Sequence, residues 1–213
     1  MELTNDDIAE EWRRRSRRAG LARVMRDSQP AELNPRVTDA TRLILADYLD
    51  AVSRRTGRPV RSALEVGCGI GRLTPTIADH AEQVVALDMT SEMLDAAAAT
   101  CAGLGNIEFH QYPAARLPWG QSRFDVGVCI WVLMHVLAED ELAKICHALS
   151  QSTRHLVLIE YEQAAIPVGR YSRLRSLDDY LRLLPGVELV EQHTLDYGGD
   201  RSFAALLEFP QGR

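Results

Sequence analysis

Short apolar runs alternate with amphipathic segments along most of the chain. The runs occupy residues 63–66, 83–88, 107–111, 124–132 and 155–161. Segments with apolar residues at helical spacing lie between or after them, at 72–81, 92–101 and 139–149. Short buried strands that alternate with helices predict a parallel sheet covered by helices on both faces. The expected fold class is therefore α/β and doubly wound.

The two ends of the chain break this alternation. Residues 4–26 and 37–55 predict two helices, the first capped by Thr4, Asn5 or Asp6 and the second ended by Gly57. After a short predicted helix at 177–184, strands at 187–195 and 202–209 are joined by a turn at 197–200, which predicts a hairpin. No repeat or linker interrupts the chain, so we expect a single domain over 1–213.

A glycine-rich turn follows the first strand of the alternating region. Three glycines stand at alternate positions, Gly67, Gly69 and Gly71, and the next strand ends at Asp88. Such a turn brings main-chain amides close to a ligand, and a carboxylate about twenty residues further on can bind ribose hydroxyls. The turn alone would also fit a core turn without a ligand. The turn and the acid together favour a nucleoside ligand.

Composition and charge exclude several classes of protein. The chain has 213 residues and a net charge of −6, which disfavours a nucleic-acid partner. Its N-terminus is acidic and no run is long enough to span a membrane, so we expect a cytoplasmic protein without a membrane partner. The four cysteines are far apart and form neither a disulfide framework nor a zinc site, so no metal is expected.

With these segments in place, the chain resembles the class I S-adenosylmethionine-dependent methyltransferases from residue 37 onward. The matching pieces, in order, are LEVGCGIGRLT at 64–74, VVALDMTSEML at 84–94, the LPW turn at 117–119, FDVGVCIWVLMHV at 124–136 and the terminal hairpin. The resemblance implies a seven-stranded sheet with an antiparallel last strand. It also divides the domain into a helical lid (1–56), a cofactor-binding core (57–161) and a substrate-side segment with the closing hairpin (162–213).

The resemblance assigns S-adenosylmethionine to the carboxyl ends of the first two strands. It implies that Glu65 orients the amino group, that Asp88 binds both ribose hydroxyls and that Met89 lies against the adenine. The three glycines would form the floor under the methionine part. The remaining cofactor contacts implied are Cys68, Arg72, Ala114, Ala115, Cys129 and Ile130.

One position departs from the family pattern. Many such enzymes place an acid before the Leu-Pro turn to bind the adenine amino group, and residues 113–115 are Pro-Ala-Ala here. Adenine recognition would then depend on backbone groups and packing. A nicotinamide cofactor is the alternative ligand, but the third glycine follows the second by two positions instead of three, and the closing hairpin fits a dehydrogenase poorly.

The residues expected at the transfer site follow the fourth and fifth strands. His135, Glu160 and Tyr161 are the candidate catalytic residues, because a base is needed only if the acceptor arrives protonated. His135 would fit equally well a histidine bonded to backbone at a helix start. Trp131 is predicted to form a pocket wall, with Trp12 of the lid and Tyr171 as further substrate contacts.

Three functions remain open at this point. The leading hypothesis is methyl transfer to oxygen or nitrogen of a small molecule, by a monomer or homodimer. The motif Trp131-Val132-x-x-His135 also resembles the protein N-terminal α-amine methyltransferases, although the acids that family uses after the fifth strand are not evident. A peptide amine is therefore the alternative acceptor. The third is a cofactor-binding protein without catalysis.

Overall fold

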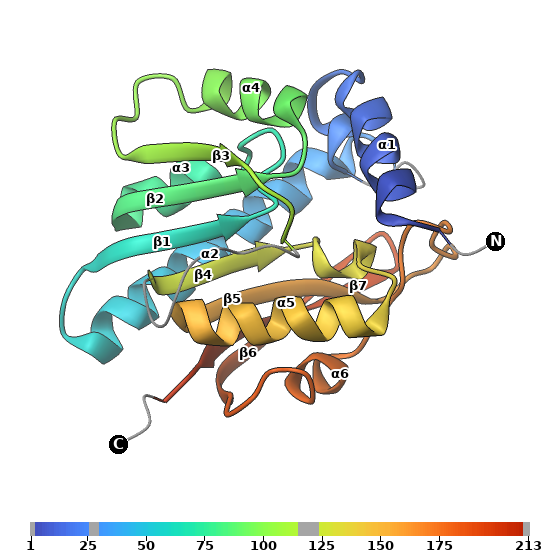
Figure 1. Cartoon of the computed structure of the whole chain (residues 1–213). Helices are drawn as coiled ribbons and strands as arrows, with labels where there is room; N and C mark the ends of the chain where they lie inside the picture. The colour runs from blue at the N-terminus through green and yellow to red at the C-terminus, as the bar shows by residue number, and fades with distance from the viewer. Residues whose placement is uncertain (1–2, 26–29, 115–123, 211–213) are drawn as a thin grey trace.

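The computed structural model describes residues 3–25, 30–114 and 124–210. Figure 1 shows a twisted sheet with helices on both sides and a small helical segment beyond one end of its strands. The strands are β1 (Val60–Val66), β2 (Ala81–Asp88), β3 (Ile107–Gln111), β4 (Phe124–Ile130), β5 (Thr153–Gln163), β6 (Glu188–Tyr197) and β7 (Asp200–Glu208). The helices are α1 (Asn5–Ser16), α2 (Leu33–Thr56), α3 (Thr74–His80), α4 (Ser91–Thr100), α5 (Glu139–Ser152) and α6 (Leu177–Leu181), with 3-10 turns η1 (Gly20–Arg23) and η3 (Leu133–His135).

The sheet has seven strands in the order β3-β2-β1-β4-β5-β7-β6. Neighbouring strands from β3 to β5 run parallel, and β7 runs antiparallel to both β5 and β6. This confirms the predicted α/β class and the antiparallel last strand. The order reverses between β1 and β4, so their carboxyl ends open onto a crevice where ligands bind in sheets of this kind.

Alternate residues of each strand pack on opposite faces of the sheet. Along β5, Val157 and Ile159 join the core under α2 and α3, whereas Leu156 and Leu158 join the core under α5 and α6. The central strands are therefore apolar on both sides, which explains the unbroken apolar runs in the sequence. Helix α4 covers β2 and β3, with Ala97 in a third, smaller cluster.

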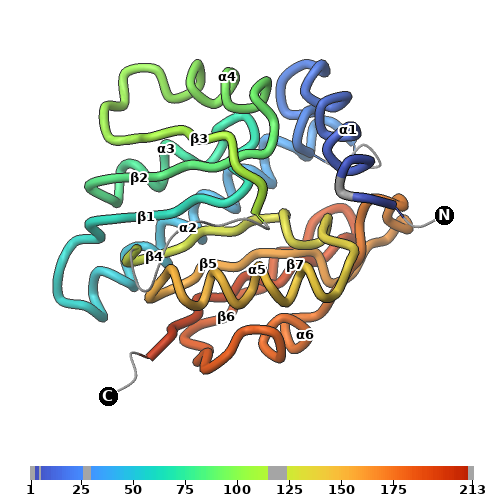
Figure 2. Tube along the Cα trace, in the orientation of Figure 1, coloured from blue at the N-terminus to red at the C-terminus, as the bar shows by residue number. Residues whose placement is uncertain are grey.

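The N-terminal helix is shorter than predicted. Thr4 caps α1 in a reciprocal pair with Asp7, but the helix ends at Ser16 instead of continuing to residue 26. Gly20 has φ +52°, a conformation that an α-helix cannot contain, and the chain there forms η1. In both Figure 1 and Figure 2, α1 lies beyond the carboxyl ends of the parallel strands. The second helix of the region predicted as a lid (1–56), α2, instead packs in the core against the sheet.

Helix α2 begins earlier than predicted, at residue 33 instead of 37. Pro35 lies in its first turn, where the missing N–H would have had no helical partner. Its predicted end is confirmed, because Gly57 takes a left-handed conformation after the last turn. The predicted hairpin is also confirmed: Tyr197 pairs with Asp200 across Gly198 and Gly199, which both have positive φ.

Candidate functional site

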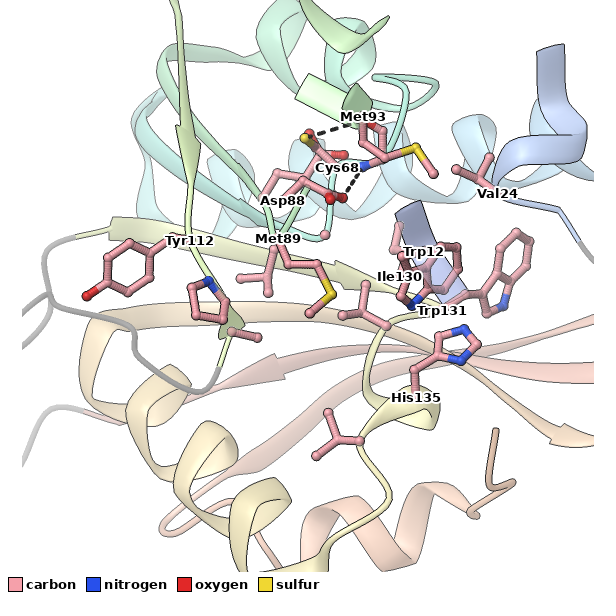
Figure 3. Close-up of a pocket in the computed structure, with 18 of the residues that line it drawn as sticks. Trp12, Val24, Cys68, Asp88, Met89, Met93, Tyr112, Ile130, Trp131 and His135 are labelled. Carbon is pink, nitrogen blue, oxygen red and sulfur yellow. Dashed lines mark hydrogen bonds between the residues drawn. The ribbon is translucent and has the colours of Figure 1, made fainter. Parts of the chain in front are cut away.

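A cavity of about 480 Å³ opens at the carboxyl ends of β1, β2 and β4, under α1. Figure 3 shows Asp88 and Cys68 on one side of it, Trp131 and His135 on another, and Met89 between them. Twelve residues that the sequence predicted for the site line this cavity: Trp12, Glu65, Gly67, Cys68, Gly69, Arg72, Asp88, Met89, Ala114, Ile130, Trp131 and His135. The predicted cofactor residue Ala115 and the LPW turn lie outside the described residues.

Asp88 ends β2 with its carboxylate at the glycine turn. One carboxylate oxygen accepts a hydrogen bond from the Gly69 amide at 3.0 Å, and the other accepts from the amide and hydroxyl of Thr90 at 3.0 and 3.1 Å. Burial raises the pKa of Asp88 above its ordinary value, and these three hydrogen bonds oppose the shift. The carboxylate is thereby fixed in direction at the cavity wall, where two acceptor oxygens can receive a pair of hydroxyl groups.

Glu65 lies near the end of β1 and is only 4% exposed. The Thr74 hydroxyl donates to its carboxylate at 2.6 Å. Burial raises the pKa of Glu65 to about 7, although Thr74 and the Arg72 cation both lower it. A buried carboxyl group of this kind favours a cation beside it, so Glu65 is suited to an ammonium group in the cavity.

Arg72 is 8% exposed and places its guanidinium 4.7 Å from the centre of the Trp131 ring. Its Nη1 atom is buried and has no hydrogen-bond partner among the described residues. Burial lowers the pKa of Arg72 to about 10, so the group remains a cation near neutral pH. A buried donor without a partner is costly. A ligand carboxylate in the cavity would satisfy it.

These three groups fit S-adenosylmethionine. The cofactor's methionine part carries one ammonium and one carboxylate, and its ribose carries two neighbouring hydroxyls. Glu65, Arg72 and Asp88 offer the complementary group for each, and all three line the same cavity. Met89, Tyr112, Pro113 and Ala114 form an apolar wall beyond Asp88, where a flat base can pack.

The glycine turn is required by packing within the protein. A Cβ atom on Gly71 would lie 3.0 Å from the Ala97 Cα in α4, and Gly71 has φ +74°. A Cβ on Gly67 would lie 2.4 Å from a Val132 methyl group. The sequence pattern suggested that a ligand needs to approach these glycines closely. The structure shows that close approach of α4 and of the chain after β4 already requires glycine at both positions.

Two predicted cofactor residues do not line the cavity. Cys129 is fully buried in the core under α5, because its side chain points away from the face that Val128 and Ile130 present to the cavity. Consecutive residues of a strand point to opposite faces, so Cys129 and Ile130 cannot both form the same wall. Gly71 lies behind the wall, against α4. The assignment of cofactor contacts to these two residues is corrected accordingly.

A second cavity of about 260 Å³ adjoins the first. The predicted residues Tyr161 and Tyr171 line it. Five described residues line both cavities and form the wall that the two share: Ile8, Trp12, Val24, Trp131 and His135. We call this shared wall the waist. The predicted substrate contacts are therefore brought together, with Trp12 contributed by α1 and Trp131 and His135 by the end of β4 and η3.

His135 is oriented by the segment that follows β5. Its Nδ1 lies 2.8 Å from the Tyr171 carbonyl oxygen and 3.2 Å from the Ser172 hydroxyl. A carbonyl only accepts, so Nδ1 carries the proton and Nε2 keeps a lone pair. Burial lowers the pKa of His135 to about 4, and the nearby Arg15 cation acts in the same direction. His135 is therefore neutral near pH 7, with Nε2 as a hydrogen-bond acceptor. Its bond to the Tyr171 carbonyl matches one of the two predicted interpretations, a histidine bonded to the backbone.

Glu160, predicted as a catalytic residue, lines neither cavity. It is fully buried, and its carboxylate accepts hydrogen bonds from the amides of Val132, Leu133 and Met134 at 2.9, 2.6 and 3.3 Å. Because Glu160 is fully buried outside both cavities, it stabilises the turn that carries His135 and does not contact a substrate. The side chains of consecutive strand residues again diverge, and Tyr161 faces the second cavity.

Several lining residues were not anticipated from the sequence. Tyr112 directly follows β3, so its place at the carboxyl edge of the sheet could have been inferred. Val24 and Met25 reach the cavities only because η1 folds back across the crevice, and no sequence pattern indicates that. Trp131 has φ +57°, the one positive value for a residue other than glycine in the described chain. Strain of this kind concentrates at functional sites.

The described part of the chain contains no group of three or more His, Cys, Asp or Glu side chains placed to bind a metal ion. Among its helices, none combines the length and apolar character needed to cross a membrane.

Comparison with known proteins agrees with the geometry of the first cavity. A family model described as "Methyltransferase domain" matches residues 63–156, from β1 into β5. The chain is 33% identical over 106 residues to a ubiquinone biosynthesis O-methyltransferase of Pseudoalteromonas translucida (strain TAC 125), which covers 48% of this chain and 44% of that protein. The chain thus spans about half the length of the curated relatives it matches.

Solved structures share the fold over nearly the whole chain. The N-methyltransferase NodS from Bradyrhizobium japonicum WM9, in complex with S-adenosyl-L-homocysteine, superposes with a TM-score of 0.73 at 18% identity, covering 96% of this chain and 99% of that one. A S-adenosylmethionine-dependent methyltransferase of Leishmania major gives a TM-score of 0.78 at 18% identity, covering 95% and 82%. The likeness at this identity concerns the fold.

Proposed function

Because this chain belongs to the class I S-adenosylmethionine-dependent methyltransferases, we propose that it transfers a methyl group from S-adenosylmethionine to an oxygen or nitrogen atom of a small molecule. The observation that carries the proposal is the placement of Glu65, Arg72 and Asp88 together in the wall of the first cavity, which Asp6 and Glu141 also line. The names of similar proteins support both acceptor atoms, since one is an O-methyltransferase and one an N-methyltransferase.

When bound, S-adenosylmethionine supplies a methyl group that its sulfonium charge makes electrophilic. The protein then has to align the acceptor with that methyl group and exclude water, which can supply much of the rate. Glu65, Arg72 and Asp88 would fix the two ends of the cofactor, so that the methyl group faces the waist. Trp12 and Trp131 would flank the methyl group, and the Nε2 lone pair of His135 would accept a hydrogen bond from the acceptor.

In this proposal the methyl group passes from the larger cavity to the smaller one at the waist. The larger cavity holds the three groups suited to the cofactor, whereas the smaller one contains none of them. Of the described residues, only those of the waist line both cavities, so donor and acceptor would meet there. We assign Trp12, Trp131, Tyr161 and Tyr171 to the acceptor side, and His135 to the reacting atom.

A direct test is titration calorimetry with S-adenosylmethionine and S-adenosylhomocysteine. We expect both to bind at micromolar strength, and Asp88→Asn to weaken both by about 10- to 100-fold, because a charge-assisted hydrogen bond contributes roughly 1.5–3 kcal/mol. Asp95→Asn, on an exposed position of α4, is the matched control and should bind as the unaltered protein does.

Two results would contradict the proposal. Absence of heat from both ligands would show that the cavity does not bind this cofactor. Tight binding with no methylated product across a broad acceptor screen, followed by mass spectrometry, would instead support a cofactor-binding protein without catalysis. Methylation confined to peptide N-termini would select the peptide-amine alternative.

A further inference from the structure

The second cavity limits the size of an acceptor that can reach the waist. At about 260 Å³ it is smaller than the roughly 300–1,000 Å³ typical of pockets for drug-sized ligands. Residues of α1 and of segment 167–172 both line it. Such a space suits a molecule with a single ring and small substituents.

Aromatic rings form much of the wall of this cavity. Trp131 stacks on Tyr161 with ring centres 5.3 Å apart and an angle of 26° between the planes. The Trp12 ring meets the His135 ring edge to face at 4.9 Å, and Tyr171 is the fifth lining ring. Flat walls pack well against a flat molecule, because stacked and edge-to-face contacts add to the burial of apolar surface. Most other uncharged lining side chains are apolar too: Ile8, Val24, Met25, Met134, Pro167 and Val168.

The two charged side chains among the described lining residues, Glu11 and Arg15, are both engaged by other groups of the protein. Arg14 donates hydrogen bonds to the two carboxylate oxygens of Glu11 at 2.8 and 2.7 Å. Arg15 donates to the Met25 carbonyl oxygen, lies 4.8 Å from the centre of the Trp12 ring and takes part in further interactions. Because these charges are already used within the protein, an ionised group on the acceptor would lose its hydration without gaining a dedicated partner.

The orientation of His135 favours a hydroxyl group at the waist. Its Nδ1–H donates to the Tyr171 carbonyl oxygen 2.8 Å away, so the polar atom that the ring still offers is Nε2, with its lone pair. A hydroxyl group can donate a hydrogen bond to that lone pair and keep its own lone pairs for attack on the methyl group. Because His135 lines both cavities, such a hydroxyl would lie where donor and acceptor meet.

The basicity of His135 also separates hydroxyl acceptors from amines. Burial lowers its pKa to about 4, so Nε2 is a weak base near neutral pH. An ammonium nitrogen has no lone pair and must lose a proton before it attacks, and so weak a base cannot remove that proton in advance. A hydroxyl oxygen attacks with a lone pair that it already has, and releases its proton as the new bond forms.

We propose that the acceptor is an uncharged phenol with a single ring, which packs against the aromatic wall of the second cavity and places its hydroxyl at the waist beside His135 Nε2. The inference rests on the proposed function and names the substrate class of the same site. The phenol oxygen forms a bond to the methyl carbon while the carbon–sulfur bond of S-adenosylmethionine breaks, with its electron pair left on sulfur. The hydroxyl proton passes to His135 Nε2 and from there to solvent.

The test compares single-ring phenols that differ in charge. The unaltered protein is given S-adenosylmethionine with the cresols and hydroxybenzamides, which are uncharged, and with the hydroxybenzoates and tyramine, which are ionised. Aniline, benzylamine and a peptide with a free N-terminus probe nitrogen acceptors, and mass spectrometry identifies the products. We expect methyl ethers of at least one uncharged phenol, with kcat/KM at least about tenfold above that of any ionised phenol, because a buried charge without a partner is costly.

A substitution then tests the hydrogen bond to the hydroxyl group. His135→Phe keeps a ring beside Trp12 but has no proton acceptor, so kcat for the phenol should fall at least about tenfold at pH 7. The loss should be smaller at pH 9.5, because a phenol ionises near pH 10, as tyrosine does, and the ionised form has no proton to release. His147→Phe, at an exposed position of α5, is the matched control and should leave kcat unchanged at both pH values. Binding of S-adenosylhomocysteine to both variants shows that they are folded.

The outcomes separate the two proposals. Equal or preferential methylation of a hydroxybenzoate, tyramine, aniline, benzylamine or the peptide would overturn the acceptor class while leaving the methyltransferase function intact. Product from other acceptors but none from any uncharged phenol would do the same. Unchanged kcat in His135→Phe, or an equal loss at both pH values, would overturn the placement of the hydroxyl beside Nε2. Failure to bind S-adenosylmethionine, or binding without product from any acceptor, would contradict the proposed function itself.

Discussion

The buried carboxyl group of Glu65 titrates near neutral pH. Its carboxyl group is 4% exposed, and burial raises its pKa to about 7. In the free protein it is therefore partly protonated near neutral pH, and a protonated carboxyl group is a poor partner for an ammonium. Binding of the cofactor would favour the ionised form and release a proton.

We expect affinity for S-adenosylmethionine to fall as the pH drops below about 7, by about tenfold per pH unit once Glu65 is mostly protonated. Titration calorimetry at a series of pH values, in buffers of different ionisation enthalpy, measures both the affinity and the released proton. Glu65→Gln should bind more weakly and with little dependence on pH. Equal affinity at pH 5.5 and 8 in the unaltered protein would show that Glu65 does not face the ammonium group.

Some residues of the site can be predicted from the sequence, whereas others can be identified only from the structure. The glycine turn and Asp88 were identified because their spacing along the chain reflects a fixed strand-turn-helix geometry. The end of the fifth strand predicts Glu160 as a catalytic candidate and the family resemblance implies Cys129 as a cofactor contact, yet both side chains point away from the cavities. Successive side chains of a strand point to opposite faces of the sheet, so only alternate residues reach the cavity. Closeness in sequence to a site residue does not show which face a side chain takes.

At the scale of elements, hydrogen bonds from two buried side chains, Glu160 and Arg175, stabilise the turn η3. The Glu160 carboxylate accepts hydrogen bonds from the amides of residues 132–134. The Arg175 guanidinium donates hydrogen bonds to the carbonyl oxygens of Leu133 and Val136 at 3.4 and 2.9 Å. Arg175 also bonds to Glu139 at the start of α5, at 3.0 Å. Both side chains are buried, so they restrict where the turn can place His135.

Glu160→Gln should affect turnover more than cofactor affinity. The amide has one acceptor oxygen and introduces donors that face the turn's own N–H groups, so we expect a loss of about 1–3 kcal/mol in the free energy of unfolding. Urea unfolding measures this loss, and S-adenosylhomocysteine titration tests the cofactor site. A fall in kcat with unchanged KM and cofactor affinity would mark Glu160 as a positioning residue. Unchanged kcat would contradict that role.

A second prediction at this scale concerns the contact between the glycine turn and α4. Gly71→Ala introduces a Cβ 3.0 Å from the Ala97 Cα, whereas Gly57→Ala introduces one with nothing within 4 Å at a similar φ, +67° against +74°. Both substitutions carry the cost of a left-handed conformation, roughly 1 kcal/mol, and only Gly71→Ala adds a clash, so it should lower stability by about 1–3 kcal/mol more. Thermal or urea unfolding of the two variants measures the difference.

Most elements of the core could be predicted because short apolar runs in the strands alternate with segments that have apolar residues at helical spacing. The ends of α1 and α2 could not be placed as well. The conformation of Gly20 prevents a single helix from continuing to residue 26, and Pro35 is accepted in the second helix because it falls in the first turn. Both outcomes depend on local geometry that apolar periodicity does not report.

At the scale of the whole molecule, the site is assembled from segments that are far apart in sequence. The waist takes Ile8 and Trp12 from α1, Val24 from the end of η1, and Trp131 and His135 from the chain after β4. The alternation of strands and helices predicts the sheet and its crevice. The path of residues 3–25 across that crevice is a tertiary contact that a local pattern cannot specify, so the second cavity emerged only from the structure.

Two of the chain's three tryptophans stand in the walls where donor and acceptor would meet, and one of them is in contact with the Arg72 guanidinium. Indole emission depends on the charges and solvent around the ring. The unlabelled protein therefore contains its own optical reporter: S-adenosylhomocysteine should shift or quench its intrinsic fluorescence, and Trp131→Phe should remove much of that signal. A silent titration, alongside heat of binding, would place the ligand away from both rings.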